Sequence, residues 1–313
     1  MNNPLRAIDL CCGAGGWAVA ARGLPIEITD GFDDWLPACE TYALNHPGAR
    51  VHKIDLTHQV EVVSIFADNG RPDVILGGIP CQWISPACGK NKAAPGEVSR
   101  QRKLLDSVMF YVDALKPRWW CLEDVIQLRR ELLPLTPCQI LDAHMRGYSC
   151  QARKRLFVGV YPKVPRGPGG QRFSDCAASG PYEIKPSSRR AELVPFGRHK
   201  GKGWAKQRVC IHLDADRAPT VLAWRGQHGN TAPLVRDERL PGGIRELTWQ
   251  EMARLQGFPA DYVFVGGAAD IGTMIANAVQ IDLARAILKA ICDEAFPHGS
   301  GDPAEKEEVS RHA

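Results

Sequence analysis

Cys81 has the setting in this 313-residue chain that most strongly suggests chemistry. It follows an apolar run that ends in two glycines and a proline, in the stretch "LGGIPCQWIS" (76–85). A cysteine placed there can be a buried apolar thiol, half of a metal or disulfide pair, or a nucleophile at the end of a strand. A core thiol does not need this turn, whereas Pro80 stiffens the backbone that presents its neighbour. The setting therefore favours a functional Cys81.

Polar side chains also follow other apolar runs. The short runs lie at residues 6–10, 26–32, 51–54, 73–78, 119–122 and 155–160. Their alternation with helical patterns is typical of a doubly wound α/β sheet, in which ligands bind at the carboxyl ends of the strands. We expect one edge of this sheet to carry Asp9, Asp33, Asp55, Cys81 and Glu123.

Two helices have boundary signals in the sequence. Apolar residues at helical spacing predict a crossover helix over 99–117, with Ser99 as its cap and Pro117 at its end. Thr248 and Glu251 form the pattern of a capping box at the start of a second helix.

The composition bounds the class of protein. With 44% hydrophobic residues, the chain can build one large core and a small second domain. No basic-plus-apolar leader and no apolar stretch of membrane-span length is visible, which predicts a soluble, intracellular, cytoplasmic protein. The eleven cysteines include no CxxC pair, so neither a disulfide framework nor a metal site is predicted.

Positive charge is concentrated in one segment. Residues 163–210 hold eleven lysines and arginines against three acidic residues, whereas residues 1–99 hold seven basic against eleven acidic ones. The segment is either a solvated loop region or a surface for a polyanion.

The stretch "CCGAGGWAVAA" (11–21) suggests a nucleotide-like cofactor. Gly13, Gly15 and Ala18 loosely match a dinucleotide-binding turn, and Asp33 lies at the distance of a ribose-binding acid. NAD and S-adenosylmethionine both fit this pattern. A nicotinamide enzyme does not need a strand-end cysteine together with a glutamate, whereas methyl transfer to a pyrimidine does. A thiolate must add to C6, assisted by an acid at N3, before C5 becomes nucleophilic.

In six collinear motifs, the chain resembles the cytosine-C5 DNA methyltransferase family. The motifs are "DLCCGAGG" (9–16), "GGIPCQWIS" (77–85), "LEDV" (122–125), "QARKRLFVGV" (151–160), "RELTWQEMARLQGFP" (245–259) and "IANAVQIDLARAI" (275–287).

The resemblance implies roles for individual residues. Cys81 is the expected nucleophile, Glu123 the group that binds N3 and the exocyclic amine of cytosine, and Arg153 and Arg155 the contacts to the flipped base. The expected S-adenosylmethionine-binding residues are Asp9, Gly13, Ala14, Gly15, Gly16, Asp33, Asp55, Pro80 and Asn277. The expected DNA contacts include Gln82, Ser85, Lys90, Arg198, Lys200 and Lys202.

The same resemblance implies the domain organisation. A Rossmann-like catalytic domain spans residues 1–160 and 245–297, a small basic target-recognition domain spans 161–244, and 298–313 form a disordered tail.

Three departures from the family pattern stand out. Asp124 replaces the usual asparagine and is expected to raise the pKa of Glu123, and Cys11 replaces a phenylalanine. The family has a strand and a loop between a Gly-Tyr pair and the paired arginines, yet Gly147 to Gln151 reaches only about 14 Å when extended. An abbreviated strand, a missing segment or displaced arginines would each account for this.

The sequence thus predicts a monomeric, S-adenosylmethionine-dependent DNA (cytosine-5)-methyltransferase that acts on double-stranded DNA through a covalent cysteine adduct. Its length suits restriction-modification, with a cognate restriction endonuclease, or phage DNA protection in a bacterial cell. The alternatives are a tRNA cytosine-C5 methyltransferase and a non-catalytic DNA-binding relative.

Overall fold

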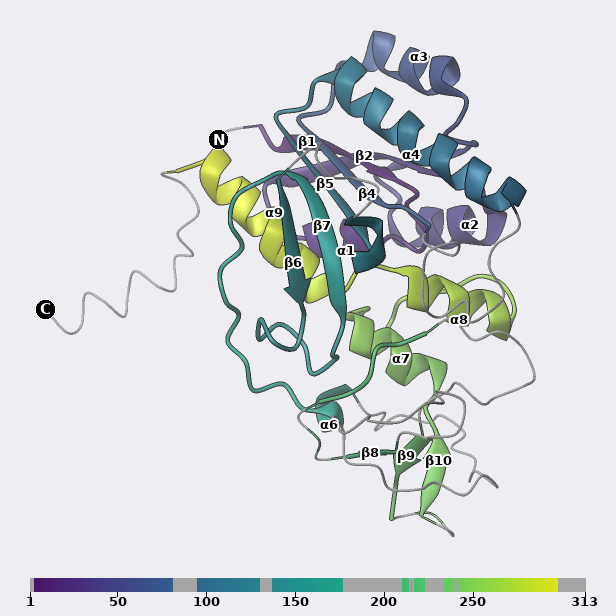
Figure 1. The fold of residues 1–313 in the computed structure, drawn as a ribbon, viewed down its shortest axis with the longest axis vertical. Coiled ribbons are helices and arrows are strands. Elements are labelled where there is room, and N and C mark those ends of the chain that lie inside the picture. The colour runs from purple at the N-terminus through teal and green to yellow at the C-terminus, as the bar shows by residue number, and fades with distance from the viewer. Residues whose placement is uncertain are drawn as a thin grey trace, which may run out of the picture.

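A mostly parallel β-sheet organises the chain (Figure 1). The computed structural model describes residues 3–80, 95–129, 137–176, 210–213, 215, 217–222, 234–238, 240 and 243–297. Seven strands lie in the order β3-β2-β1-β4-β5-β7-β6, and only the β5–β7 and β7–β6 pairs are antiparallel. Their bounds are β1 Leu5–Leu10, β2 Ile26–Asp33, β3 Arg50–Lys53, β4 Val74–Gly78, β5 Trp119–Asp124, β6 Cys138–Asp142 and β7 Lys154–Val160. The predicted doubly wound sheet is confirmed, and the six apolar runs are six of its strands.

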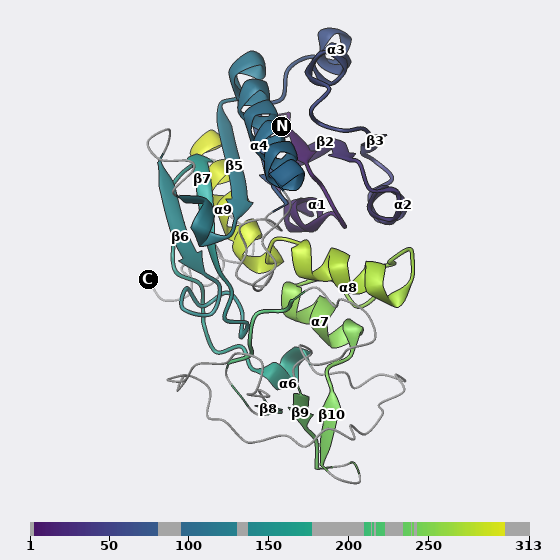
Figure 2. The same ribbon diagram turned by 45° about the vertical axis from the view of Figure 1, so that its right-hand side comes forward.

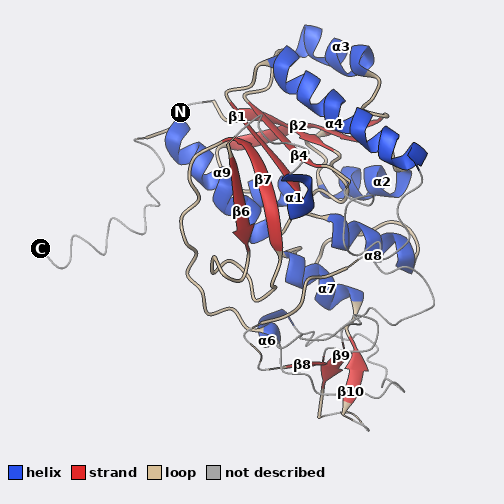
Figure 3. Cartoon of the chain, in the orientation of Figure 1, coloured by secondary structure: helices blue, strands red, loops and turns tan. Residues whose placement is uncertain are grey.

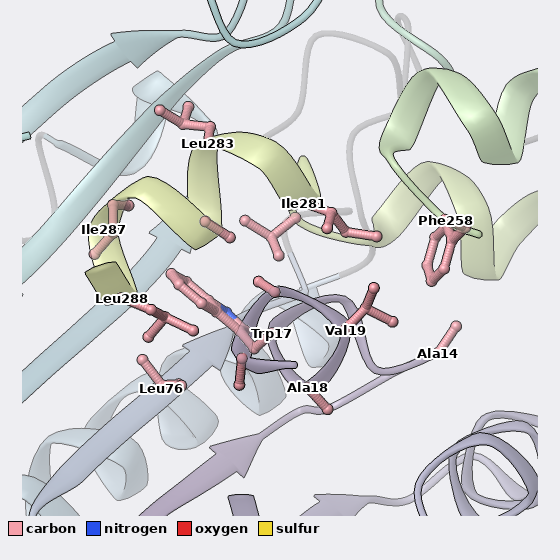
Figure 4. Close-up of a cluster of buried hydrophobic side chains, with 14 of the residues drawn as sticks. Ala14, Trp17, Ala18, Val19, Leu76, Phe258, Ile281, Leu283, Ile287 and Leu288 are labelled. Atoms are coloured by element: carbon pink, nitrogen blue, oxygen red, sulfur yellow. The ribbon is translucent and has the colours of Figure 1, made fainter. Parts of the chain in front are cut away.

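Helices cover both faces of the sheet (Figure 2). One face carries α1 (Gly16–Ala21), α2 (Leu36–Asn45) and α9 (Ile281–Ala295), and the other carries α3 (Gln59–Asn69) and α4 (Pro95–Leu115). Trp17 of α1 is buried beneath α9, beside Leu288 and Leu76 (Figure 4). Because both faces are buried, the inner strands read as continuous apolar runs.

The ends of the two predicted helices differ in outcome. α4 begins at Pro95, so the prediction that Ser99 caps it is wrong; proline suits the first helical turn, where its missing N–H costs nothing. The helix ends at Leu115, and Lys116 takes a left-handed φ of 48° before Pro117. The capping box between Thr248 and Glu251 is confirmed.

A second group of elements lies beyond the carboxyl edge of the large sheet (Figure 3). It comprises α6 (Phe173–Cys176), β8 (Cys210–His212), β9 (Leu234–Arg236), β10 (Ile244–Glu246), α7 (Trp249–Gln256) and α8 (Ala268–Asn277). β8, β9 and β10 form a three-stranded sheet. The chain at 217–222 returns to the large unit, where Ala218 bridges Gln151. A short 3-10 turn, Ile126–Leu128, follows β5.

A buried ion cluster joins β10 to α7. The Arg245 guanidinium donates to Glu251 at 2.7 and 2.8 Å and to Asp237 at 2.9 Å, and all three side chains are essentially inaccessible. Burial would lower the pKa of Arg245, but the hydrogen bonds to Glu251 and Asp237 outweigh it and raise that pKa. Glu251 also accepts from the main chain of Thr248, so the cluster and the capping box are one structure.

The edge strand β6 corrects the expectation about Tyr148. β6 precedes Gly147 and pairs with β7 along its length, from Cys138 opposite Val158 to Asp142 opposite Lys154. Tyr148 lies in the turn between these strands, where its N–H donates to Ala143, so no long span is required. The edge strand is therefore present, and Arg155 lies in a fully paired β7.

Asp30 forms an ion triad at the other side of the sheet. Its inaccessible carboxylate accepts from Arg50 at 2.8 and 2.9 Å and lies 2.8 Å from Nε2 of His52. Burial alone would raise the pKa of Asp30, but the hydrogen bonds from His52 and Arg50 lower it well below its ordinary range.

Replacing Asp30 by asparagine is expected to lower the free energy of unfolding at pH 7 by about 1–2 kcal/mol, because Arg50 is half-exposed and its contribution is screened. A depressed folded-state pKa stabilises above the ordinary value of about 3.9 and loses that contribution as pH falls. Urea denaturation should therefore show the difference shrinking below pH 4. A difference that is the same at pH 7 and pH 3 contradicts this.

Among the described helices, none alone has the length and hydropathy of a membrane span; α8 and α9 reach them only together, across a 41° bend.

Candidate active site

The carboxyl ends of the parallel strands bring the predicted strand-end residues to one edge. Asp33 ends β2, Asp55 follows β3 by two residues, and Glu123 lies near the end of β5. Glu123 is in register with Gly78 of β4, and a Cβ on Gly78 would lie 3.9 Å from its carboxylate. Pro80, half-buried, is the last described residue before Cys81.

The loop between β1 and α1 is a tight, backbone-lined turn. Cys11, Gly13 and Gly15 have φ values of 52°, 53° and 83°, a left-handed conformation that favours glycine. A Cβ on Gly15 would lie 2.6 Å from Nε2 of His46, so no other residue fits there without a shift. A Cβ on Gly13 would meet no described atom within 4 Å, so its backbone borders open space.

Asp33 ties this loop to the end of β2. Its carboxylate accepts the N–H of Gly13 at 2.8 Å and the N–H of Trp35 at 2.9 Å. Burial raises the pKa of Asp33, and these main-chain donors act against the rise. Asp34, the next residue, is exposed. From sequence, Asp33 and not Asp34 was the expected ribose-binding acid.

Asp9 is completely buried, and within the described part of the chain neither carboxylate oxygen has a hydrogen-bond partner. Burial raises the pKa of Asp9 well above its ordinary range and Asp33 raises it further; the Tyr42 hydroxyl opposes the shift without reaching hydrogen-bond geometry. Asp55 accepts the main-chain N–H and hydroxyl of Thr57, both at 2.9 Å.

These residues fit S-adenosylmethionine. The orphaned Asp9 oxygens, the open backbone of Gly13 and the acids that follow β2 and β3 combine close main-chain approach with hydrogen-bonding groups for a polar nucleoside.

Glu123 and Arg155 form an ion pair at the same edge of the sheet. Arg155 Nε lies 3.0 Å from Glu123 Oε1, and both side chains are largely buried. β5 and β7 are antiparallel neighbours, with Glu123 opposite Phe157, which brings Arg155 alongside the glutamate. A buried carboxyl with one cationic neighbour can bind and protonate a heteroaromatic ring.

The unusual Asp124 is buried on the opposite face of β5 from Glu123, since successive strand side chains alternate. Burial, then the charge of Glu123, raises the pKa of Asp124 well above its ordinary range.

Arg153 lies apart from this pair. It is 2% exposed and donates to the carbonyls of Ala276 and Ala278 at 2.9 and 2.8 Å. Its guanidinium therefore holds the end of α8, where the exposed Asn277 is the last helical residue. This geometry favours a positioning role for Arg153 over the base contact expected from sequence.

Two glutamines missed in the sequence complete this support. Gln151 donates to Leu255 and Gln256, both at 2.9 Å, and Gln256 donates to the Ile275 and Ala278 carbonyls. Both side chains are fully buried. In the sequence they lie within the motif stretches "QARKR" (151–155) and "RLQGF" (254–258), which were the signal that could have identified them.

Several predicted residues lie outside the described part of the chain: Cys81, Gln82, Ser85, Lys90, Arg198, Lys200 and Lys202.

Comparisons with known proteins agree on one family. The model of the C-5 cytosine-specific DNA methylase family matches residues 5–153 and 194–293. The Type II methyltransferase M.HgiDI of Herpetosiphon aurantiacus is 28% identical, covering 90% of this chain and 92% of that protein. The Type II methyltransferase M.HindV of Haemophilus influenzae is 27% identical, covering 92% and 96%.

Solved structures share the fold. A putative DNA modification methyltransferase encoded within a prophage of E. coli has a TM-score of 0.66 at 19% identity, covering 91% of this chain and 98% of that one. The S. pombe Dnmt2 methyltransferase has a TM-score of 0.63 at 15% identity, covering 94% and 100%. Because the family model matches most of the chain, the chain belongs to the C-5 cytosine-specific DNA methylase family and is an S-adenosylmethionine-dependent DNA (cytosine-5)-methyltransferase.

Proposed function

We propose that the protein methylates a flipped cytosine within a short recognition sequence of double-stranded DNA, through a covalent adduct with Cys81. The observation that carries this proposal is the buried Glu123–Arg155 pair, which lies beside Gly78, three residues before Cys81. A flipped base can reach such a strand edge, whereas a stacked base cannot.

The roles follow from the chemistry of cytosine. The Cys81 thiolate adds to C6 while the Glu123 carboxyl gives a proton to N3 and accepts from the exocyclic amine, so that C5 becomes enamine-like. Arg155 holds the Glu123 carboxyl and contacts the base at O2. Bound S-adenosylmethionine supplies an electrophilic methyl group. The C5 proton is then lost to solvent, the thiolate leaves C6, and the proton on N3 returns to the Glu123 carboxylate, which restores the ring and frees both Cys81 and Glu123 for another cycle.

The cofactor is held at the carboxyl ends of β1 to β4. Gly13, Ala14, Gly15 and Gly16 give it close backbone approach, and Asp9, Asp55, Pro80 and Asn277 complete the pocket. We assign the ribose hydroxyls to Asp34, because both oxygens of Asp33 already accept main-chain N–H groups, from Gly13 and Trp35. Asp33 then shapes the pocket by holding the loop.

Because Asp33 and Asp34 have different proposed roles, their alanine variants are expected to differ in their effects on stability. Asp34→Ala is expected to raise the Kd for S-adenosylmethionine about tenfold with unchanged stability, since an exposed residue contributes little to folding. Asp33→Ala is expected to weaken binding and also to lower the free energy of unfolding by about 1–3 kcal/mol, because two main-chain donors lose their acceptor. Calorimetric titration and urea denaturation measure both. An Asp34→Ala variant with wild-type affinity contradicts the assignment.

The basic segment is the proposed target-recognition domain, over residues 161–244. Its lysines and arginines, among them Arg198, Lys200 and Lys202, suit phosphate contacts that position the duplex, and Gln82, Ser85 and Lys90 are proposed to contact DNA beside the nucleophile. We propose that the protein acts as a monomer and protects DNA from a partner restriction endonuclease; the similarity to Type II methyltransferases supports the protective role.

The proposal is tested by incubating the protein with methyl-labelled S-adenosylmethionine and mixed-sequence DNA, a cytosine-free duplex or tRNA. Label is expected only in the cytosine-containing duplex, as 5-methylcytosine on nucleoside mass spectrometry. Equal labelling of tRNA, or label in the cytosine-free duplex, overturns the proposed substrate.

A further inference from the structure

A chain of hydrogen bonds reaches the loop between β1 and α1, to which we assign cofactor binding. The chain comes from residues that are not among the predicted cofactor-binding residues. The Tyr262 hydroxyl donates to the Ala14 carbonyl, and Nε2 of His46 lies 3.0 Å from the same hydroxyl. Because the single hydroxyl proton goes to Ala14, the Tyr262 oxygen accepts from His46, which requires the Nε2–H tautomer. Burial, reinforced by the charge of Arg22, lowers the pKa of His46 to about 4, so the ring is neutral at pH 7 and carries this one N–H.

Packing holds both rings in place. The centroids of the His46 and Tyr42 rings are 4.8 Å apart, and so are the centroids of the Tyr262 and Phe258 rings. Phe258 lies on the Ala14 side of α1 (Figure 4). The His46 and Tyr262 rings are therefore held by neighbouring aromatic side chains, so they form a fixed support against which the loop is bonded.

Hydrogen bonds between α2 side chains and the main chain of Val263 and Val265 hold the Tyr262 segment against α2. The Asn45 amide donates to the Val263 carbonyl at 2.7 Å and accepts its N–H at 3.1 Å, and Thr41 accepts the N–H of Val265 at 2.9 Å. Asn45 and Thr41 belong to α2, which directly precedes His46. His46 and Tyr262 are therefore both anchored to α2.

Gly15 brings the loop into direct contact with this pair. Its backbone has φ 83°, and a Cβ there would lie 2.6 Å from Nε2 of His46 and 3.0 Å from the Tyr262 hydroxyl. Gly15 also donates its N–H to Cys12 at 2.9 Å. The Ala14–Gly15 peptide is therefore bonded at its carbonyl to Tyr262 and at its N–H to the start of the loop.

We propose that His46 and Tyr262 are positioning residues, which fix the Ala14–Gly15 peptide so that the loop is already formed when S-adenosylmethionine binds. A loop ordered in advance avoids the entropic cost of ordering on binding, so the pair acts on cofactor affinity rather than on the chemical step. Neither residue lies in the sequence motifs quoted above.

Tyr262→Phe tests this directly, because it removes the hydroxyl and keeps the ring. The Kd for S-adenosylmethionine, measured by calorimetry without DNA, is expected to rise about tenfold, while kcat at saturating cofactor stays within about twofold. His46→Leu is expected to weaken binding similarly, and His46→Gln, which retains an amide donor, to restore most of the affinity.

Tyr161→Phe is the matched control, since its hydroxyl donates to the Phe157 carbonyl at 3.1 Å, away from the loop. Its Kd is expected to equal that of the wild type. The inference is overturned if Tyr262→Phe binds the cofactor normally, if the control weakens binding equally, or if His46→Gln behaves like His46→Leu. The His46 variants decide the matter if Tyr262→Phe does not fold, and binding without DNA separates this test from the proposed substrate.

Discussion

Replacing Glu123 by glutamine is expected to lower the single-turnover rate of methyl transfer about a thousandfold, because an amide cannot give a proton to N3 of cytosine. The side chain keeps its size and its acceptor for the exocyclic amine. Glu123 is 4% exposed and lies 3.0 Å from Arg155, so solvent cannot readily replace the lost proton donor. The measurement uses labelled S-adenosylmethionine with excess enzyme, and the cofactor Kd should be unchanged.

Asp124→Asn is the matched control for Glu123→Gln. Asp124 is the next residue of β5, is equally buried and points to the other face. Its raised pKa favours a neutral carboxyl, which asparagine resembles in shape and charge, so the rate is expected to stay within about threefold. If Asp124→Asn lowered the rate of methyl transfer as much as Glu123→Gln, the result would contradict the specific role proposed for Glu123.

Replacing Arg245 by methionine is expected to lower the free energy of unfolding by about 3–5 kcal/mol. The substitution leaves the Asp237 and Glu251 carboxylates buried without their guanidinium, and such charges are expensive to bury. The cluster also supports the Thr248 capping box, so loss of α7 helicity should accompany the destabilisation. Urea denaturation followed by circular dichroism measures both effects.

Two further variants sharpen the Arg245 experiment. Arg245→Lys keeps the charge but loses bidentate bonding to Glu251, so an intermediate loss of about 2 kcal/mol is expected. Lys289→Met removes one partner of an exposed helical pair, with Asp293 at 3.0 Å, and should change stability by less than about 0.5 kcal/mol. Equal losses at Arg245 and Lys289 would contradict the account of the buried cluster.

The sequence predicted the sheet well because each inner strand is buried on both faces and reads as an apolar run. β6 was missed for the opposite reason, since at the sheet edge "CQILD" is only partly buried and mixes polar with apolar residues. That omission made the Tyr148 connection look too short. The Ser99 cap failed because Pro95 starts the helix earlier, a signal that was in the sequence but outside the apolar spacing.

At the site, motif spacing placed Glu123 and Arg155 on strands that the structure shows to be neighbours. It could not separate Arg153 from Arg155, because only three-dimensional packing turns one guanidinium to the end of α8 and the other to Glu123. Nor could it find His46 and Tyr262, which are 216 residues apart and meet through folding alone.

The covalent role of Cys81 is tested most directly with a duplex that contains 5-fluorocytosine and with S-adenosylmethionine present. Fluorine at C5 cannot leave as a proton does, so a working enzyme is trapped on the DNA after methyl transfer. The account predicts a protein–DNA adduct that survives denaturation with the wild-type protein and is absent with Cys81→Ser. The absence of any adduct on mixed-sequence DNA, while S-adenosylmethionine still binds, would contradict it.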